Sequence, residues 1–410
     1  MTETRRSRRR QASLWEDQRL TLAGAIDLTA ASLRAYGAAY RHWCVAYSGG
    51  KDSTATVTLV AHLLATGAVP APETLTILYA DTGMELPPLH LSALAILAAL
   101  RERGVATRVV RPPLDRRFFV YMLGRGVPPP RPGFRWCTGA LKVDPMAGAM
   151  AGLRAAAGDK LLLLTGVRLG ESAVRDGRIA VACSKDGAEC GQGYFQREPP
   201  KAATDVLAPI VHWRVCHVWD WLTFDAPALG FPTADIAEVY GGDEKEEINA
   251  RTGCVACNVA TRETNLDTLL ALPQWAYLAP FRRLRPLYAE LVRPHHRLRK
   301  NGQERYSDGR LFRNPTRLGP LLLDSRRWGL GEVLRIQSDI GEAARALGRP
   351  EVALVDAEEL ARIEELIAAE TWPDGWDGSE LHGDDVVDLV RGEGVVQPLL
   401  IGEGTYRVEA

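Results

Sequence analysis

The chain has 410 residues, 46% of them hydrophobic, and its 50 Lys and Arg against 51 Asp and Glu leave a formal net charge of −1. This composition is that of a globular protein long enough for two or three domains, and it excludes a fibrous or wholly disordered chain. No apolar run reaches the ~20 residues that a membrane span requires, and the Arg-rich start lacks the apolar segment of a signal peptide. We therefore expect a cytoplasmic protein with no membrane partner.

The first two hundred residues predict an α/β domain. Residues 1–18 are polar and basic, which predicts a disordered tail. After a helical pattern at 20–40, apolar runs alternate with helical patterns, as in a parallel sheet covered by helices on both faces. The expected strands are 44–47, 75–80, 106–110 and 161–167, and the expected helices are 53–65, 86–103 and 143–157.

The rest of the chain is less regular and mainly helical in pattern. We expect a strand at 208–213 and helices at 218–224, 244–251, 330–347 and 357–369, with 267–317 mainly helical. The chain then divides into a tail (1–18), an α/β domain (19–232), a region with a Cys-x-x-Cys pair and basic helices (233–320), and an acidic helical C-terminal region (321–410).

The loop after the first strand is the strongest functional signal. Two glycines before a helix leave backbone N–H groups at the positive end of the helix dipole, where an anion binds closely. Lys51 adds a positive charge, and Asp52 suits a Mg²⁺ ion carried by phosphates. A tight turn would explain the two glycines but not the whole set, and the spacing is not that of a Walker loop. The predicted phosphate-binding residues are Ser48, Gly49, Gly50, Lys51, Asp52, Ser53 and Thr54.

Polar residues also follow two other expected strands. Asp81 and Thr82 come after the second strand, and Gly166 and Arg168 follow the last one, with Arg175 close behind. Each group alone is typical of a turn or a helix cap. Because parallel strands place their carboxyl ends at one edge of the sheet, the groups together predict a nucleotide pocket there.

Five of the seven cysteines are candidate metal ligands, while Cys44 and Cys216 are expected to be buried apolar residues. The pair Cys254 and Cys257 has the spacing of zinc, redox and iron–sulfur sites alike. We expect Cys137 to join it from the sheet edge, with Cys190 as the fourth ligand and Cys183 as its alternative. Thiolates from separated segments favour a 4Fe–4S cluster over structural zinc or free thiols that transfer sulfur.

Charge is unevenly distributed along the second half of the chain. Residues 282–317 are strongly basic and carry interleaved aromatic and His residues, whereas 339–388 are mostly acidic. The basic stretch has two equal interpretations: it follows a nucleic-acid backbone, or it is a solvated face paired with the acidic region.

Taken together, the motifs Ser48–Thr54, Asp81-Thr82-Gly83, Arg135–Thr138, Gly166–Ser172 and Gly253–Cys257 resemble the phosphoadenylylsulfate (PAPS) reductase family. The resemblance spans about residues 43–265 and is greatest to the DndC/SspD branch, the ATP pyrophosphatases of bacterial DNA phosphorothioate modification. It implies a Rossmann-like, adenine nucleotide α-hydrolase-like sheet and makes 19–232 the PP-loop ATP pyrophosphatase domain. It also implies ATP, Mg²⁺ and a 4Fe–4S cluster as cofactors, and DNA, a cysteine desulfurase and other phosphorothioation proteins as partners.

On this hypothesis the enzyme adenylates a backbone phosphate oxygen of DNA, so that AMP leaves when sulfur is inserted. Lys51, Asp52 and Arg168 are the expected catalytic residues, and Arg168 and Arg175 would hold phosphate. A tRNA-thiolating or sulfonucleotide-metabolising enzyme is the alternative, although no cysteine follows Cys257 to serve as the reductase nucleophile and a second Cys-x-x-Cys pair is missing. An alternative of another class is a non-catalytic subunit that binds ATP and DNA and contains a zinc site.

Overall fold

The computed structural model describes residues 20–170, 188–189, 194–234, 236–240, 254–260, 263–391 and 394–399. The predicted tail at 1–18 and the predicted helix at 244–251 lie outside these residues. Within the described ranges, the helices are too short or too polar to cross a membrane.

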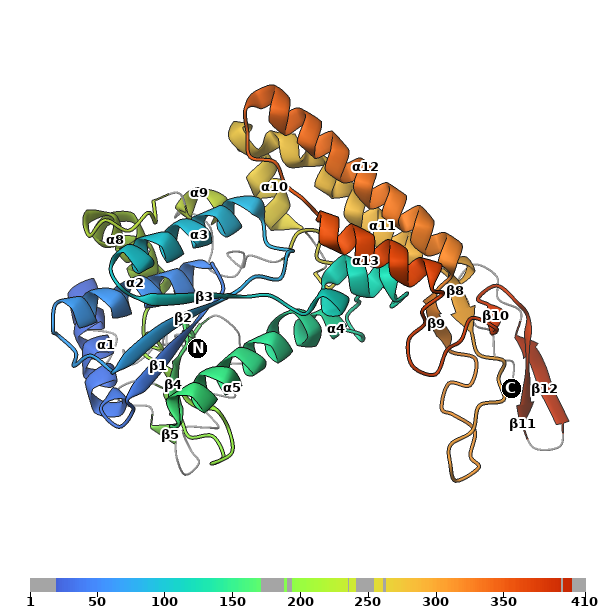
Figure 1. Cartoon of the computed structure of the whole chain (residues 1–410), viewed down its shortest axis with the longest axis horizontal. Helices are drawn as coiled ribbons and strands as arrows, with labels where there is room; N and C mark the ends of the chain where they lie inside the picture. Colours follow the sequence, from blue (N-terminus) through green and yellow to red (C-terminus); the bar gives the residue numbers. More distant parts are fainter. Residues whose placement is uncertain are drawn as a thin grey trace, which may run out of the picture.

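A seven-stranded sheet forms one half of the molecule, with the strand order β3-β2-β1-β4-β7-β6-β5 (Figure 1). Its strands are β1 (His42–Tyr47), β2 (Thr74–Ala80), β3 (Ala106–Val110), β4 (Leu161–Leu164), β5 (Ala188–Glu189), β6 (Tyr194–Gln196) and β7 (Thr204–Ala208). The first four strands and β7 are parallel, which confirms the predicted fold class. The short β5 and β6 add an antiparallel edge that the sequence pattern did not predict.

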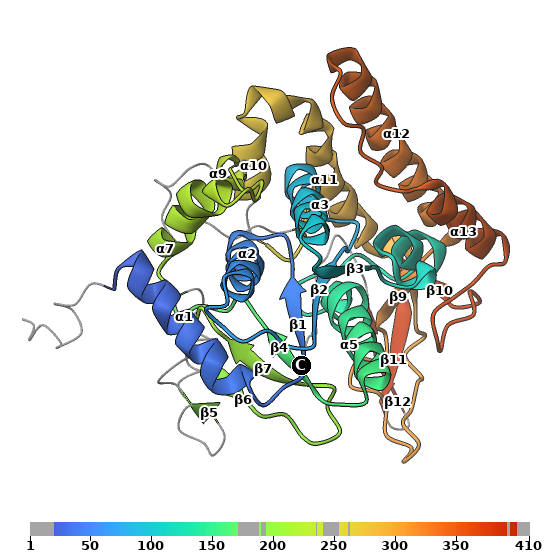
Figure 2. The same ribbon diagram turned by 60° about the vertical axis from the view of Figure 1, so that its left-hand side comes forward.

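Helices cover both faces of this sheet (Figure 2). Helices α1 (Leu22–Gly37), α2 (Lys51–Ala65) and α3 (Pro87–Glu102) pack on one face, and α5 (Asp144–Ala157) packs on the other. Alternate residues of β1 serve the two layers: Val45 and Tyr47 join the core with α2, while Cys44 packs with Ala149 of α5. Successive residues of a strand point to opposite faces of the sheet, and helices cover both faces. The sequence of each strand is therefore a continuous apolar run.

Short helices and turns connect these layers. They are η1 (Leu114–Arg116), η2 (Val120–Gly124), α4 (Trp136–Thr138), η3 (Gly139–Val143), α7 (Val215–Asp220), η4 (Trp221–Asp225), α8 (Ala226–Ala228) and α9 (Ile236–Tyr240). The strand expected at 208–213 is wrong, because backbone N–H groups of Val211 and Trp213 close turns onto Ala208 and Ile210. The segment is apolar because Trp213 is buried against α1, where its indole N–H donates to the carbonyl of Ala25 and the hydroxyl of Thr29.

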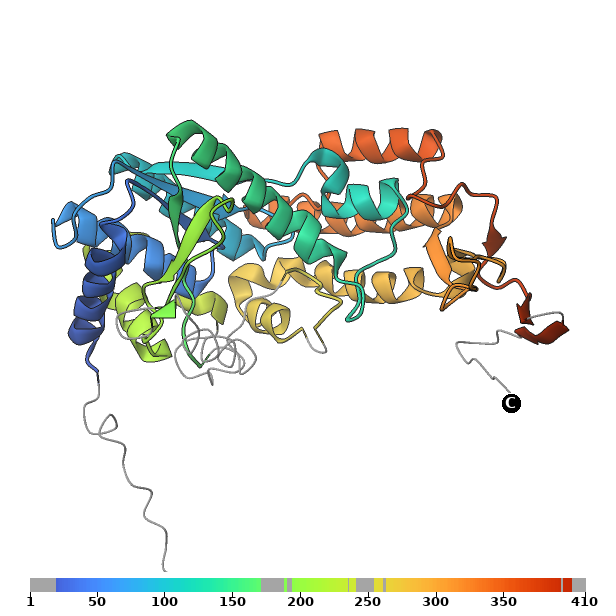
Figure 3. The same ribbon diagram turned by 90° about the horizontal axis from the view of Figure 1, so that it is seen from below.

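The other half of the molecule is mainly helical and extends away from the sheet (Figure 3). Its helices are α10 (Thr264–Leu270), η6 (Pro273–Arg283), α11 (Leu284–Leu291), η7 (Pro294–His296), α12 (Leu323–Leu347) and α13 (Ala357–Ala368). Its strands are β8 (Arg297–Arg299), β9 (Leu318–Leu321), β10 (Leu381–His382), β11 (Val387–Arg391) and β12 (Gly394–Leu399). The helical stretch predicted for 267–317 therefore ends at His296, where buried β8 pairs with β9 and β10.

A buried arginine holds three parts of this half together. Arg326 of α12 is 0% exposed, and its guanidinium donates to the carbonyl oxygens of Leu321 (2.9 Å), Gly124 (3.2 Å) and Thr371 (2.7 Å). Burial lowers the pKa of Arg326 to about 10. A Cβ at Gly126, whose φ is +76°, would lie 2.2 Å from the same guanidinium. The charge is thus stabilised by peptide dipoles collected from η2, β9 and the chain after α13.

We expect Arg326→Met to lower the free energy of unfolding by about 3 kcal/mol or more, because three buried carbonyl groups lose their donor. The matched control is Arg327→Met, since Arg327 is exposed and pairs with Asp324 at 2.9 Å on the surface. That change should cost less than about 1 kcal/mol. Urea unfolding of both variants measures the difference, and equal losses would contradict the structural role of Arg326.

Candidate active site

The predicted phosphate loop joins β1 to α2 at the carboxyl edge of the sheet. Gly49 has a φ of +74°, a left-handed conformation that favours glycine, and a Cβ there would lie 3.2 Å from that of Ala93. Helix α2 begins at Lys51, earlier than expected, so Lys51 and Asp52 belong to its first turn. The hydroxyl groups of Ser53 and Thr54 both donate to the carbonyl of Gly50 at 3.0 Å, which holds the turn closed.

Asp52 lies between two buried cations. Its carboxylate is 3.1 Å from Nζ of Lys51 and accepts a hydrogen bond from Nε of Arg168. Lys51 is 4% exposed and Arg168 is 0% exposed. The side chain of Lys51 also lies over the ring of Tyr240, and its backbone N–H donates to the Tyr240 hydroxyl at 3.1 Å. The head of α2 thus holds two buried cations and one carboxylate beside the helix N-terminus, which is where the helix dipole favours an anion.

Gly166 explains how Arg168 reaches the phosphate loop. A Cβ at Gly166 would lie 2.8 Å from the backbone nitrogen of Ser53 and 2.9 Å from the carbonyl of Asp52. The chain leaving β4 therefore touches the backbone of α2, and a side chain at this position would push the two apart. The structure thus brings together the predicted residues at 48–54, Gly166 and Arg168, whereas Arg175 lies outside the described residues.

The loop after β2 lines two adjoining cavities, of about 170 and 250 Å³. Asp81 is 2% exposed; it pairs with Nε of Arg111 at 2.6 Å and accepts the N–H of Gly83 at 3.1 Å. Thr82 donates its backbone N–H (3.1 Å) and its hydroxyl (2.6 Å) to the Glu85 carboxylate. The cavities at this edge therefore have both acidic and basic walls. Their lining residues include none of the phosphate loop, so the nucleotide pocket shared by all three groups stays a prediction.

The acidic wall fits a hard divalent cation. Asp81, Glu85 and His90 bring their ligand atoms within 4.8 Å of one another, and Mg²⁺ is held in proteins by one or two carboxylates together with phosphate oxygens. Asp52, the residue expected to place Mg²⁺, pairs with Lys51 and Arg168 in this structure. The carboxylates of the β2 loop are thus better suited to the metal than sequence reasoning indicated.

The Cys254–Cys257 turn is fastened to the same edge. The N–H of Val255 donates to the carbonyl of Met84 in the β2 loop at 2.7 Å. On its other side, the Asn258 amide donates to the carbonyl of Pro130 at 3.0 Å, in the loop that leads to Cys137. Two loops that are far apart in sequence therefore hold the Cys-x-x-Cys turn between them.

Three of the four predicted cysteine ligands come together. Burial is the main cause that raises the pKa of Cys254 to about 11, and the neighbouring Cys257 and Cys137 thiols contribute in the same direction. Burial, followed by the effect of Cys257, also raises the pKa of Cys137. Such buried thiols are neutral until a cation or metal stabilises their thiolates. Both candidates for the fourth ligand, Cys190 and Cys183, lie outside the described residues.

The spacing of the thiols bears on the metal that they fit. A tetrahedral zinc ion with Zn–S bonds of ~2.3 Å brings its thiolates to within ~3.8 Å of one another. Among the described residues, Cys137, Cys254 and Cys257 do not form a group whose sulfur atoms all lie within 4.8 Å. A four-iron cluster holds its thiolates farther apart, because each binds a different iron atom. Thiol donors are the chemistry that such a cluster requires, and the sulfur separations here are bounded only from below.

Outside this group, the two remaining cysteines behave differently from each other. Cys44 is buried, as expected, but the prediction that Cys216 is buried is wrong, since it is exposed on α7.

A cavity of about 480 Å³ lies beside the loop that carries Cys137. It is lined on one side by Pro128, Arg131 and Phe134, and on the other by Arg317 and Trp376. Arg131 is exposed, Phe134 is 40% exposed, and the guanidinium of Arg317 stacks on the Trp376 ring at 5.5 Å. Cations and aromatic faces in one groove are the features that single-stranded nucleic acid requires.

The basic stretch at 282–317 fits both of its interpretations in part. Arg283 pairs with Asp339, and Lys300 pairs with Glu380 at 2.8 Å, as expected for a face neutralised by the acidic region. Arg317 also has an acidic neighbour, Glu304 at 3.3 Å, yet its guanidinium lines the cavity.

Sequence reasoning missed several residues at this edge. Arg111 follows β3 directly, and the rule that drew attention to Asp81 and Arg168 would have found it. Tyr240 and the segment 353–359 were not predictable in this way, because they reach the site from other parts of the chain.

We expect Gly166→Ala to cost about 1–3 kcal/mol of stability, because the new Cβ pushes against the backbone of α2, and to weaken adenine nucleotide binding about tenfold or more. Gly148→Ala is the matched control, since a Cβ at that helical glycine has open space within 4 Å. Thermal unfolding and calorimetric titration with an ATP analogue measure both effects. If Gly166→Ala bound the nucleotide as tightly as wild type, the contact between Gly166 and α2 would not be needed for the phosphate loop to bind phosphate.

Comparison with known proteins agrees with the geometry of the sheet edge. Residues 42–226 match the model of the phosphoadenosine phosphosulfate reductase domain. A comparison with curated proteins gives no match.

Three solved structures illustrate the distant likenesses of the chain. The phosphoadenylyl-sulfate (PAPS) reductase from Candida auris, a phosphate complex, shares 12% identity over 53% of this chain and 92% of its own, with a TM-score of 0.33. The FMN adenylyltransferase of Candida glabrata, in complex with FMN and the ATP analogue AMPCPP, shares 13% identity over 60% and 81%, with a TM-score of 0.35. The U34-tRNA thiolase NcsA from Methanococcus maripaludis, with its [4Fe-4S] cluster, shares 13% identity over 66% and 77%, with a TM-score of 0.34.

From the family match, the motifs and the parallel sheet together, we conclude that this chain contains a phosphoadenosine phosphosulfate reductase-like domain at residues 42–226.

Proposed function

We propose that this protein is a PP-loop ATP pyrophosphatase that activates a backbone phosphate oxygen of DNA for replacement by sulfur. The observation that carries the proposal is the meeting of two kinds of site at one sheet edge. The Cys254–Cys257 turn is bonded to Met84 in the loop after β2, and the phosphate loop follows β1, the neighbouring strand. This proximity supports a reaction that couples phosphate activation to sulfur chemistry.

The phosphate loop supplies what the first step needs. The acceptor oxygen attacks the α-phosphorus of ATP, the bond from that phosphorus to the bridging oxygen breaks, and pyrophosphate leaves with the electron pair. Lys51 and Arg168 face the negative charge that builds up on the departing group, in a buried setting where such contacts are strong. Their contact with Asp52 keeps them oriented until a phosphate chain takes over the charge. Asp81 and Glu85 would hold the accompanying Mg²⁺.

In the second step a sulfur nucleophile at the oxidation level of sulfide attacks the adenylated phosphorus. The oxygen that was adenylated departs with AMP, so that one P–S bond forms and one P–O bond breaks without net oxidation. Cys137, Cys254 and Cys257 would hold a 4Fe–4S cluster, which when bound supplies iron sites for sulfur beside the acceptor. A cysteine desulfurase is the proposed source of the sulfur, which it delivers as a persulfide. Two external thiols, oxidised to a disulfide, supply the two electrons that reduce it to sulfide before this step.

The cavity beside the Cys137 loop supports a nucleic acid as the acceptor. Trp136 donates its indole N–H to the carbonyl of Pro128 at 3.0 Å, which links the loop lining this groove directly to Cys137. A strand whose bases stack on Phe134 and Trp376, with its phosphates near Arg131 and Arg317, would run toward the thiols. DNA is the acceptor that we infer from the motif resemblance, and a tRNA is its direct competitor.

We expect Lys51→Met to reduce pyrophosphate release from ATP at least about a hundredfold, because the buried charge facing the leaving group is lost. Lys160→Met is the control, since Lys160 makes a similar pair with Asp205 (2.6 Å) at the start of β4, the opposite end of that strand from the site. Release should depend on added DNA rather than tRNA. Undiminished release in Lys51→Met would remove the loop from the chemistry, and dependence on tRNA would replace DNA as the acceptor.

The anaerobically purified protein is expected to be brown and to contain about four iron atoms per chain. Cys137→Ser and Cys257→Ser should each lose most of the iron and the visible absorption, whereas Cys216→Ser, an exposed cysteine outside the site, should retain both. Iron analysis and absorption spectra measure this. A colourless wild-type protein with one zinc ion held by these cysteines would contradict the cluster.

A further inference from the structure

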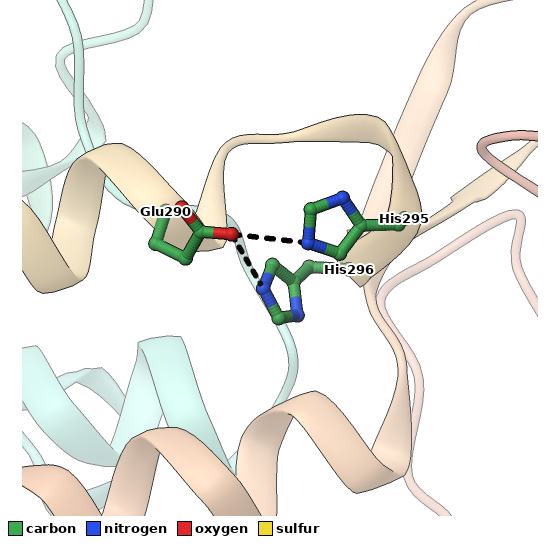
Figure 4. A group of neighbouring side chains, drawn as sticks. All are labelled: Glu290, His295 and His296. Atoms are coloured by element: carbon green, nitrogen blue, oxygen red, sulfur yellow. Dashed lines mark hydrogen bonds and ion pairs between the residues drawn. The ribbon is translucent and has the colours of Figure 1, made fainter.

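A second cluster of metal-ligating side chains lies in the helical half, between α11 and β8. Nε2 of His295 is 3.1 Å from Oε1 of Glu290, and Nε2 of His296 is 3.4 Å from the same oxygen. Figure 4 shows both imidazole rings aiming a nitrogen atom at one carboxylate. Together the three ligand atoms lie within 4.8 Å of one another.

Neighbouring groups fix Glu290 and His296 in position. The other carboxylate oxygen of Glu290 pairs with Nε of Arg293 at 3.0 Å, which leaves Oε1 for the two rings. The second ring nitrogen of His296 is 2.9 Å from the hydroxyl of Ser325, and the ring stacks on Trp328 with an interplanar angle of 6°. Supporting hydrogen bonds of this kind orient the histidine ligands of metal sites.

The backbone of the turn is also fixed. The N–H of Arg293 donates to the carbonyl of Glu290 at 2.9 Å, and the N–H of His296 donates to that of Arg293 at 3.2 Å. The carbonyl of His296 accepts the N–H of Leu322, just before α12, at 2.9 Å. The ligands are therefore preorganised by α11, η7 and α12 rather than carried on a long loop.

The two distances from Oε1 of Glu290 to the histidine nitrogen atoms match those between ligands of a metal centre. An ion with bonds of ~2.0–2.1 Å in tetrahedral geometry separates its ligand atoms by ~3.3 Å, close to the 3.1 and 3.4 Å found here. Two histidines with one carboxylate select a borderline divalent ion such as Zn²⁺ or Fe²⁺ over Mg²⁺ or Ca²⁺. The side chain of His295 is 45% exposed, so water can reach a fourth coordination position.

We propose that Glu290, His295 and His296 bind one divalent first-row transition-metal ion, with Zn²⁺ as the best fit, independently of the cysteine site. The ion fastens η7 to the end of α11 and leaves one coordination position open to solvent. The ligands of this ion are nitrogen and oxygen atoms on a different part of the fold. The metal site can therefore be tested independently of the proposed ATP and sulfur chemistry.

The test uses the full chain, stripped of loosely bound metal with a chelator and titrated anaerobically with Zn²⁺ and Co²⁺. Wild type should bind one equivalent that Glu290→Gln and His295→Gln do not bind, and Ser325→Ala should weaken that binding about tenfold. Binding should also raise the Tm of wild type but not that of the two ligand variants. His62→Gln is the control, because His62 lies on α2 against Trp221, remote in sequence from the cluster.

The absorption spectrum of bound Co²⁺ distinguishes this site from the cysteine site. Thiolate ligands give intense near-ultraviolet charge-transfer bands, whereas a site of nitrogen and oxygen ligands gives only weak visible bands. The proposal predicts that the weak bands disappear in Glu290→Gln and His295→Gln while any charge-transfer bands remain. Circular dichroism checks that both variants are folded. Equal metal content, affinity and Tm shift in wild type, Glu290→Gln and His295→Gln would overturn the proposal. The three side chains would then form a hydrogen-bonded cluster that binds no metal.

Discussion

The contact of Asp52 with Lys51 and Arg168 is the constraint on which the site depends. Two nearly inaccessible cations at the end of a sheet are costly unless anions accompany them, and Asp52 is one such anion. The fold accepts this arrangement because Gly166 lets the chain after β4 touch the backbone of α2. The backbone N–H groups at the head of α2 favour an anion, and a phosphate chain is the anion that the loop geometry favours.

Separate segments of the chain bring the thiols to the same edge of the sheet. Cys137 follows a proline-rich loop, while Cys254 and Cys257 belong to a turn more than a hundred residues later in the chain. Two hydrogen bonds, from Val255 to Met84 and from Asn258 to Pro130, hold that turn against the sheet. Since burial raises the pKa of Cys254 and of Cys137, a metal that stabilises thiolates would change the local charge strongly.

The parts of the fold that depend on local pattern were predictable from the sequence. Continuous apolar strands gave the parallel sheet, and the two glycines before Lys51 indicated the phosphate loop, because such residues are chosen by local backbone conformation. The antiparallel β5 and β6, the turn around Ile210 and the strand β8 were not predictable, since tertiary packing decides them. Tyr240, which contacts Lys51, and the segment 353–359, which lines the pocket after β2, were not predictable either, because long-range contacts bring them there. The triad of Glu290, His295 and His296 was also missed, because its spacing matches none of the usual metal motifs.

The most direct measurement of the central claim is a crystal structure of the anaerobically purified protein with a non-hydrolysable ATP analogue. The account predicts that the β- and γ-phosphates bind at Gly49, Gly50 and the head of α2, with Lys51 and Arg168 turned toward them. It also predicts one metal centre bound jointly by Cys137, Cys254 and Cys257 at the same edge. A nucleotide bound elsewhere, or a metal centre that excludes Cys137, would contradict it.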